Sequence, residues 1–268
     1  MRPPLYLYTE PKLRDPAIII GMAGWPDAGG VSSQSISYLK ELISAVPLGE
    51  IDMSDHLDLT RHRPMVVIQD GMVKSIELPK FEIHYAIQAN RDVILISGYE
   101  PLKGWNVFVN GLFGLIKTFG ASLLLSIGGL VDAVPHTRPV RISFLTTSET
   151  LRDSLRTQGF RPSNYAGPGS IHSFIMQKAS ELGVKAVSIW GHVPSYLTMP
   201  NPRIISTILE KVSKLVGIEI DLSRLYVEAS IFEGRLNDIV ANDPEMKKLV
   251  ERLEKEYDNN SDEPSYIK

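Results

Sequence analysis

The chain has 268 residues, enough for one large domain or two small ones, and its formal net charge of −3 without a basic run excludes a nucleic-acid surface. It contains no cysteine, which excludes disulfides and a cysteine nucleophile, and its six histidines lack zinc-motif spacing, so we expect no metal. The N-terminus lacks the apolar core of a signal peptide and the apolar window 107–131 is interrupted by polar residues, which favours a cytoplasmic protein without a membrane segment.

In chain order, short apolar runs rich in β-branched residues alternate with segments of helical periodicity, which is typical of a layered α/β domain. Several strands are apolar on both faces, as in a sheet between two helix layers. The expected strands are 17–23, 65–70, 81–87, 93–97, 121–127, 140–146 and 184–190. The expected helices are 30–45, 105–118, 148–158, 170–182 and 202–216.

Residues 49–87 interrupt this alternation. A run from Met65 to Gln69, the turn Asp70–Gly71 and a second run from Val73 to Leu78 predict a β-hairpin. Because the strands of a hairpin are antiparallel, we expect the sheet to be mixed.

The composition changes after residue 217. We therefore divide the chain into an α/β domain (1–217), a helical extension (218–257) and a polar, acidic tail (258–268). Within the extension, 222–240 and 243–257 have the pattern of two charged amphipathic helices without an intervening strand. The narrow apolar stripe of the second helix requires a cover, which is either the domain itself or a partner such as a second copy of the chain.

The glycine-rich segment GMAGWPDAGG, residues 21–30, lies between an apolar strand and the start of a helix. A helix start of this kind can hold an anion. The segment lacks the Lys of a P-loop and the spacing of a dinucleotide fingerprint, so a tight turn that needs glycine for its backbone angles is the competing interpretation.

Four further loops follow or adjoin expected strands: GYEP at 98–101, GGL at 128–130, YAGPGS at 165–170 and GHVP at 191–194. Loops at the carboxyl ends of strands converge on ligand sites in α/β sheets. There Glu100 would be the base and a histidine the donor, but no nucleophile elbow and no Ser/His/Asp spacing is present, so we assign no catalytic residue and no cofactor. The candidate ligand pocket consists of Gly24, Trp25, Asp27, Gly29, Gly30, Glu100, His136, Gly169, Ser170 and His192.

Five motifs occur together and in order over 20–216: GWPDAGG, GYEP, SIGGL with VPHTRPV, YAGPGSI and WGHVPSYLTMPNP. In this combination the chain resembles the archaeal and bacterial branch of the proteasome assembly chaperone family. The resemblance implies an α/β fold, a three-layer α/β/α sandwich similar to nucleoside phosphorylases with a mixed, mostly parallel sheet. It also implies homo-oligomers, trimers or larger, and proteasome α-subunits as partners.

The same resemblance draws attention to the C-terminus. Family members that bind proteasomes can end in a hydrophobic residue, a Tyr and any residue, which insert between α-subunits. This chain ends in Tyr266, Ile267 and Lys268, with the Tyr one place early and Ser265 before it. The apolar pair and the terminal carboxylate remain, so we retain this tail as a candidate partner-binding segment.

Three functions follow from these observations. The leading one is a non-enzymatic, oligomeric assembly chaperone or scaffold. The alternative is a nucleoside-phosphorylase-like enzyme, or an anion- or nucleotide-binding protein, that uses the glycine loops at the strand ends. The third is a structural oligomer whose C-terminal helices pair between subunits.

Overall fold

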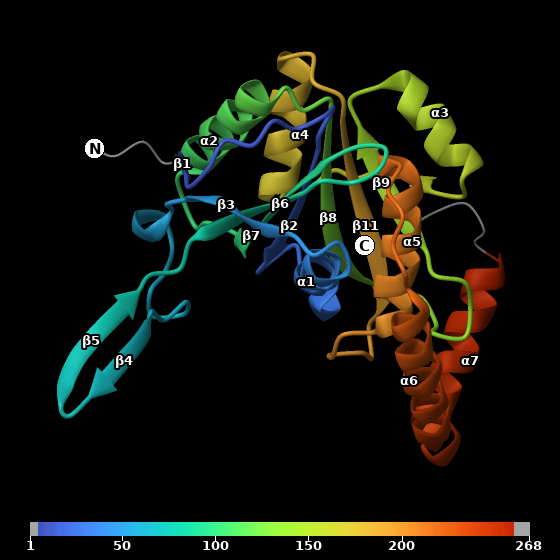
Figure 1. The fold of residues 1–268 in the computed structure, drawn as a ribbon. Coiled ribbons are helices and arrows are strands. Elements are labelled where there is room, and N and C mark those ends of the chain that lie inside the picture. The colour runs from blue at the N-terminus through green and yellow to red at the C-terminus, as the bar shows by residue number, and fades with distance from the viewer. Residues whose placement is uncertain (1–4, 260–268) are drawn as a thin grey trace.

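The computed structural model describes residues 5–259, and within this range a nine-stranded sheet forms the centre of the molecule (Figure 1). The four central strands β7, β2, β8 and β11 are parallel, whereas β1, β3 and β6 on one side and β9 on the other add antiparallel pairs. In spatial order the strands are β1 (Leu5–Leu7), β3 (Val46–Ile51), β6 (Phe81–Ala86), β7 (Val93–Tyr99), β2 (Ala17–Ala23), β8 (Leu123–Asp132), β11 (Ala186–Pro194), β9 (Ile142–Thr146) and β10 (Arg161–Pro162). The mixed, mostly parallel sheet is confirmed.

Helices cover both faces of this sheet. Along β2, Ala17 and Ile19 point to one apolar core while Ile18, Ile20 and Met22 point to a second core on the other face, as the period of two in a strand requires. The first core is covered by α1 (Val31–Leu42) and α5 (Pro202–Val216), and the second by α2 (Trp105–Phe119) and α4 (Ile171–Glu181). This arrangement is the expected three-layer α/β/α sandwich. The short helix α3 (Glu149–Thr157) lies beside β9 and β10.

Two segments expected to be loops belong to strands. The GGL segment 128–130 lies inside β8 and the GHVP segment 191–194 inside β11, which pair in register up to Pro194 and Asp132. Gly128 permits this pairing because a Cβ atom there would lie 2.6 Å from the Trp190 ring. The glycines that indicated loops in the sequence therefore serve close packing between neighbouring strands.

The expected hairpin is confirmed, but it is not part of the main sheet. Strands β4 (Met65–Gln69) and β5 (Met72–Glu77) form a separate two-stranded sheet that projects from the domain (Figure 1). The antiparallel part of the main sheet comes instead from β1, β3 and β6. Of these, β1 and β3 were not expected from the sequence.

The C-terminal helices also follow the sequence. Helix α5 begins after Asn201, whose side chain accepts a hydrogen bond from the Arg203 N–H at 2.9 Å, and ends at Gly217 with a φ of 81°. Helices α6 (Ser223–Asn242) and α7 (Pro244–Asn259) form a helical hairpin in which Val250 and Leu253 of α7 are buried. The apolar stripe of α7 is thus covered within the chain. The tail residues Tyr266, Ile267 and Lys268 lie outside the described range.

In residues 5–259 none of the helices combines the length and the hydropathy needed to cross a membrane.

Candidate functional site

The glycine-rich loop after β2 positions a carboxylate at the start of α1. Positive φ angles at Gly24, Gly29 and Gly30 turn the chain through a short 3-10 helix, η1 (Ala28–Gly30), into α1. The Asp27 carboxylate then accepts hydrogen bonds from the backbone N–H groups of Ser32 at 2.7 Å and Ser33 at 3.0 Å. Burial raises the pKa of Asp27, while these hydrogen bonds act to lower it. The place where an anion was expected is thus taken by a side chain of the protein.

A second carboxylate has the same position at α4. The Glu100 carboxylate accepts a hydrogen bond from the Ile171 N–H at 2.9 Å, and the Ser170 hydroxyl accepts one from the His172 N–H at 3.2 Å. Burial raises the pKa of Glu100, although the backbone N–H groups of Ile171 and Trp25 bond to it. Asp27 and Glu100 therefore cap two helices, which is their structural use and leaves little of either first turn for a ligand.

A cleft of about 550 Å³ lies between the opening loop, the carboxyl ends of β8 and β11, and the loop before α4. None of the described side chains along it is charged, while three aromatic rings and several glycines face it. This surface suits an uncharged, apolar group and offers hydroxyls and backbone groups for orientation. The lining residues are Trp25, Ala28, Gly129, Leu130, Val131, Leu145, Ser163, Tyr165, Gly167, Pro168, Gly169, Ser170, Ser173 and Trp190.

A buried polar cluster surrounds His192. Its Nδ1 lies 2.7 Å from Asp132 Oδ2 and its Nε2 lies 2.9 Å from Ser143 Oγ, while Arg141 donates to Asp132 Oδ2 at 3.2 Å. Burial lowers the pKa of His192, against the hydrogen bond and charge of Asp132, so the ring is neutral at neutral pH. The connectivity is that of a Ser-His-Asp triad. Ser143, however, is only 1% exposed, and it lines neither the large cleft nor the small pocket that borders His192, so its hydroxyl does not meet a substrate.

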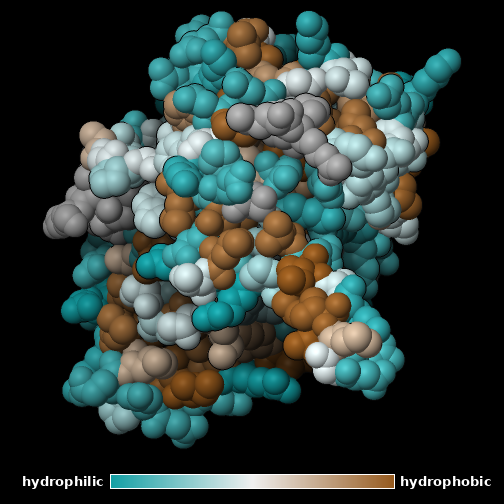
Figure 2. All heavy atoms as spheres, turned by 90° about the vertical axis from the view of Figure 1, so that its left-hand side faces the viewer, coloured by the Kyte–Doolittle hydropathy of each residue, from teal (hydrophilic) through white to brown (hydrophobic). Residues whose placement is uncertain are grey.

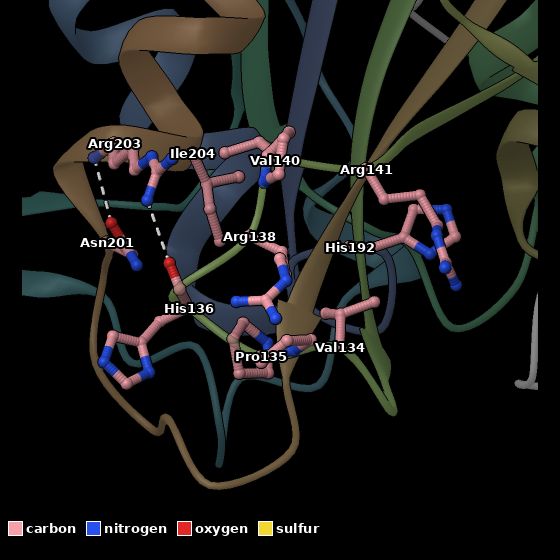
Figure 3. A pocket seen from close by; sticks show the side chains of 12 residues that line it. Val134, Pro135, His136, Arg138, Val140, Arg141, His192, Asn201, Arg203 and Ile204 are labelled. Carbon is pink, nitrogen blue, oxygen red and sulfur yellow. Dashed lines mark hydrogen bonds between the residues drawn. The ribbon is translucent and has the colours of Figure 1, made fainter. Parts of the chain in front are cut away.

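His192 also borders a small pocket of about 20 Å³, which has room for about one water molecule (Figure 3). His136 lies beside this pocket, with its Nδ1 2.6 Å from the Tyr196 hydroxyl and its Nε2 3.0 Å from Asn237 Oδ1. Arg203 donates to the His136 carbonyl at 2.9 Å (Figure 3). Burial lowers the pKa of His136 as well. The pocket is lined by Val134, Pro135, His136, Arg138, Pro139, Val140, Arg141, His192, Pro194, Asn201, Arg203 and Ile204.

The model of the PAC2 family matches residues 21–240. The chain belongs to this family, the proteasome assembly chaperone family that its five motifs indicated. Among proteins of curated function, none matches the chain.

Solved structures of PAC2 relatives share the fold. A proteasome-assembly chaperone homologue of Mycobacterium tuberculosis is 28% identical over 87% of this chain and 99% of its own, with a TM-score of 0.78. A PAC2 family protein of Streptomyces avermitilis is also 28% identical over 88% of this chain and 100% of its own, again at 0.78. An archaeal proteasome activator of Pyrococcus furiosus is 20% identical over 88% of this chain and 97% of its own, with a TM-score of 0.68, and shows the fold alone.

In this PAC2 chain the C-terminal helix α7 covers the loop beside the small pocket. Arg138 bonds to Glu254 at 3.1 Å and to Asp258 at 2.7 Å, and the Tyr257 hydroxyl donates to the Pro139 carbonyl at 3.0 Å. The Arg141 guanidinium lies 4.7 Å from the centre of the Tyr257 ring. The extension is therefore attached to the same segment that supplies Arg141 to the buried cluster.

The structure does not bring the ten expected pocket residues together in one pocket. Trp25, Gly169 and Ser170 line the large cleft. His136 and His192 lie instead at the small pocket. Of the five remaining residues, Gly24, Asp27, Gly29 and Gly30 form the turn between β2 and α1, and Glu100 caps α4.

Sequence reasoning missed the partners of His192. Asp132 lies at the end of β8, Arg141 lies in the segment before β9, and Ser143 lies in β9. His192 comes from β11, so no local sequence motif connects the four residues. Within residues 5–259 no group of His, Asp or Glu side chains has the arrangement of a metal site.

Removing the carboxylate from the start of α1 should weaken the fold. Asp27→Ala should cost about 1–2 kcal/mol of unfolding free energy, because two backbone N–H groups lose their acceptor. Asp27→Asn should cost less, since the amide oxygen can still accept. Urea unfolding of the three proteins at neutral pH measures both differences.

The pH dependence of Asp27→Asn provides a second readout. The pKa of Asp27 is raised in the folded protein, so its contribution to stability is greatest at acid pH and is lost as the pH rises through the folded-state value. Between about pH 7 and pH 4 the wild type should therefore lose less stability than Asp27→Asn, which has no titrating group there. Parallel curves would show that burial of this charge has no energetic cost.

Proposed function

We propose that this chain is a non-enzymatic, cytoplasmic scaffold, a homo-oligomer of three or more copies, that binds proteasome α-subunits. Membership of the PAC2 family and its proteasome-assembly chaperone homologues support a chaperone-related role. The observation that supports the non-enzymatic part is that Asp27 and Glu100, the two carboxylates of the expected ligand pocket, both cap helices, and that the cleft beside them is uncharged. An uncharged, aromatic cleft suits apolar protein side chains better than substrate chemistry.

Pull-down against isolated 20S α-subunits tests the proteasome partner. We expect the full chain to bind, and deletion of residues 260–268 to weaken binding by about tenfold, or about 1.4 kcal/mol. This deletion keeps Asp258, which bonds to Arg138, so helix α7 stays attached. Tyr266→Ala should reproduce the loss, whereas Ser261→Ala should bind as the full chain does. If neither the full chain nor any variant is retained by α-subunits, the proposed partner is wrong.

A second candidate function has one observation in its favour, the three aromatic rings of the cleft. Trp25, Tyr165 and Trp190 could stack on an uncharged aromatic molecule such as a nucleoside. Titration of the protein with nucleosides, followed by tryptophan fluorescence, tests this function. Quenching that saturates, and that Tyr165→Ala weakens, would support it; an unchanged signal at millimolar nucleoside would exclude it.

A further inference from the structure

The large cleft presents exposed apolar side chains. Trp25 is 63% exposed and Tyr165 is 48% exposed, and the ring of Trp190 lies along the same cleft. Val131, at 55% exposed, adds an aliphatic side chain near the end of β8. With about 550 Å³, the cleft has the size of pockets that enclose a drug-sized ligand. Two adjacent large apolar side chains of a peptide in an extended conformation form a group of that size.

The chain itself contains such a pair outside the described range. We call residues 260–268 the C-terminal segment. Within it Tyr266 and Ile267 are adjacent, and the residues before them are polar or acidic apart from Pro264. Because a proline disfavours the helical conformation of the residue before it, Pro264 favours an extended backbone at Glu263. The segment therefore offers one aromatic and one aliphatic side chain at the end of a polar stretch.

Helix α7 ends close enough to the cleft for this segment to reach it. The centre of the Tyr257 ring lies 4.7 Å from the guanidinium of Arg141. Arg141 in turn donates at 3.2 Å to Asp132, the residue that follows Val131. These contacts place the Cα atoms of Tyr257 and Val131 within about 20 Å of one another. Tyr266 is seven residues beyond the end of α7, and seven extended residues span about 23 Å.

The β4–β5 hairpin is an apolar surface that the segment does not reach. Its side chains are exposed, and the side of the molecule that carries it faces the viewer in Figure 2, where hydrophobic residues gather. In Figure 1, however, the hairpin and α7 lie at opposite sides of the main sheet. Because the C-terminal segment starts from α7, the cleft is the apolar surface within its span.

The charges between the end of α7 and the cleft agree with this direction. Asp258, near the end of α7, bonds to Arg138 at 2.7 Å, which fixes where the chain leaves the helix. Arg161 lies in the edge strand β10, and residues that follow β10 line the cleft. A chain that runs from Arg138 past Arg161 carries Asp262 and Glu263 along a positively charged edge of the sheet.

We propose that the C-terminal segment binds the cleft of its own chain, with Tyr266 and Ile267 among the aromatic rings of Trp25, Tyr165 and Trp190. Because segment and cleft belong to one chain, the effective concentration of the segment at the cleft is on the order of millimolar, and a weak contact suffices. The inference deepens the proposed function and rests on it for one consequence, namely that α-subunits and the cleft compete for the same segment. The contact itself does not depend on the proteasome partner.

Disulfide trapping in the full chain tests the contact, because the chain has no cysteine of its own. Ile267→Cys is combined with Ser173→Cys in the cleft or, as the matched control, with Ser230→Cys on α6, which is also exposed. A disulfide requires Cα atoms within about 7 Å of one another. Under mild oxidation we expect the cleft pair to form an intramolecular disulfide about tenfold faster than the control pair, as read from mobility on a non-reducing gel.

Two further variants separate the apolar pair from the mere length of the segment. Tyr266→Ala, added to the cleft pair, should slow trapping several-fold, whereas Ser261→Ala should leave the rate unchanged. Equal rates for the cleft pair and the control pair overturn the proposal. It is also overturned if the cleft pair cross-links only between two chains, since the occupant is then a second copy, or if Tyr266→Ala has no effect.

Retention by α-subunits tests the competition separately. Tyr165→Ala should release the segment from the cleft and raise retention about threefold, because a larger fraction of the chain is then competent to bind. Tyr226→Ala, which removes a similarly exposed ring from α6, should leave retention unchanged. If trapping succeeds while no variant is retained, the cleft contact stands and the proteasome partner is wrong. If α-subunits retain the chain while trapping fails, the partner stands and the cleft contact is wrong.

Discussion

Asp132→Asn should cost about 3–5 kcal/mol of unfolding free energy, because it removes the negative charge that compensates Arg141 inside the protein. The side chains of Arg141 and Asp132 are 3% and 0% exposed, and the same Asp132 oxygen also lies 2.7 Å from His192 Nδ1. A buried guanidinium without its counter-charge cannot be rehydrated unless the structure opens. Chemical denaturation at neutral pH measures the loss.

An exposed carboxylate provides the control for Asp132. Asp258 pairs with Arg138 at 2.7 Å but is half exposed, so water and salt replace the partner when Asp258→Asn removes it. Its unfolding midpoint should hardly move. If Asp132→Asn is as mild as this control, the buried cluster contributes specificity rather than stability. The unfolding free energy of Ser143→Ala would then show whether the Ser143 hydroxyl contributes to stability.

The parts of the fold that the sequence predicted best are those in which local signals agree. Helix α5 has a capping Asn201, Pro202 at its first position, a wide apolar face and Gly217 at its end, and its bounds were predicted to the residue. Strand β2 was predicted from a short run of apolar residues that point to both faces of the strand. Such a strand is expected in a sheet that has a layer of helices on each face.

The strands and strand ends that the sequence did not predict have identifiable physical causes. Strand β3 contains Pro47 and Gly49, which normally indicate a turn, and the sheet accommodates them with an irregularity in register between these two residues. Gly128 and Gly191 likewise suggested loops, yet each lies within a strand where the space of a side chain is taken by a neighbour. A glycine that serves close packing cannot be distinguished by sequence from one that serves a turn.

The candidate site shows the same limit. The sequence correctly located two helix starts after glycine-rich loops but could not show that Asp27 and Glu100 fold back to occupy them. It found His192 and not its partners, because these are brought together by strand pairing rather than by spacing along the chain. Tertiary contacts, rather than residue types, decide whether a polar group is a ligand site or a structural one.

Gly129→Ala should test whether the opening loop depends on close packing against β8. A Cβ at this position would lie 2.5 Å from the Ala28 carbonyl oxygen and 2.8 Å from the Val31 Cβ, and the Gly129 N–H donates to the Pro26 carbonyl at 2.8 Å. Because the nearest atom belongs to the backbone, the loop has to shift, which we expect to cost about 1–3 kcal/mol. The shift would also displace the Asp27 cap from α1 and change the fluorescence of Trp25.

Gly114→Ala is the matched control for this substitution. Gly114 lies inside α2, and an added Cβ would meet only Leu5 Cδ2 at 3.9 Å, an ordinary contact. Alanine favours the helix, so this variant should be more stable than the wild type by roughly 0.5–1 kcal/mol. Opposite signs for the same chemical change would show that Gly129 in β8 is required by the contact with the opening loop. Equal and small effects would mean that the loop yields easily, and the cleft beside it would then be adaptable rather than preformed.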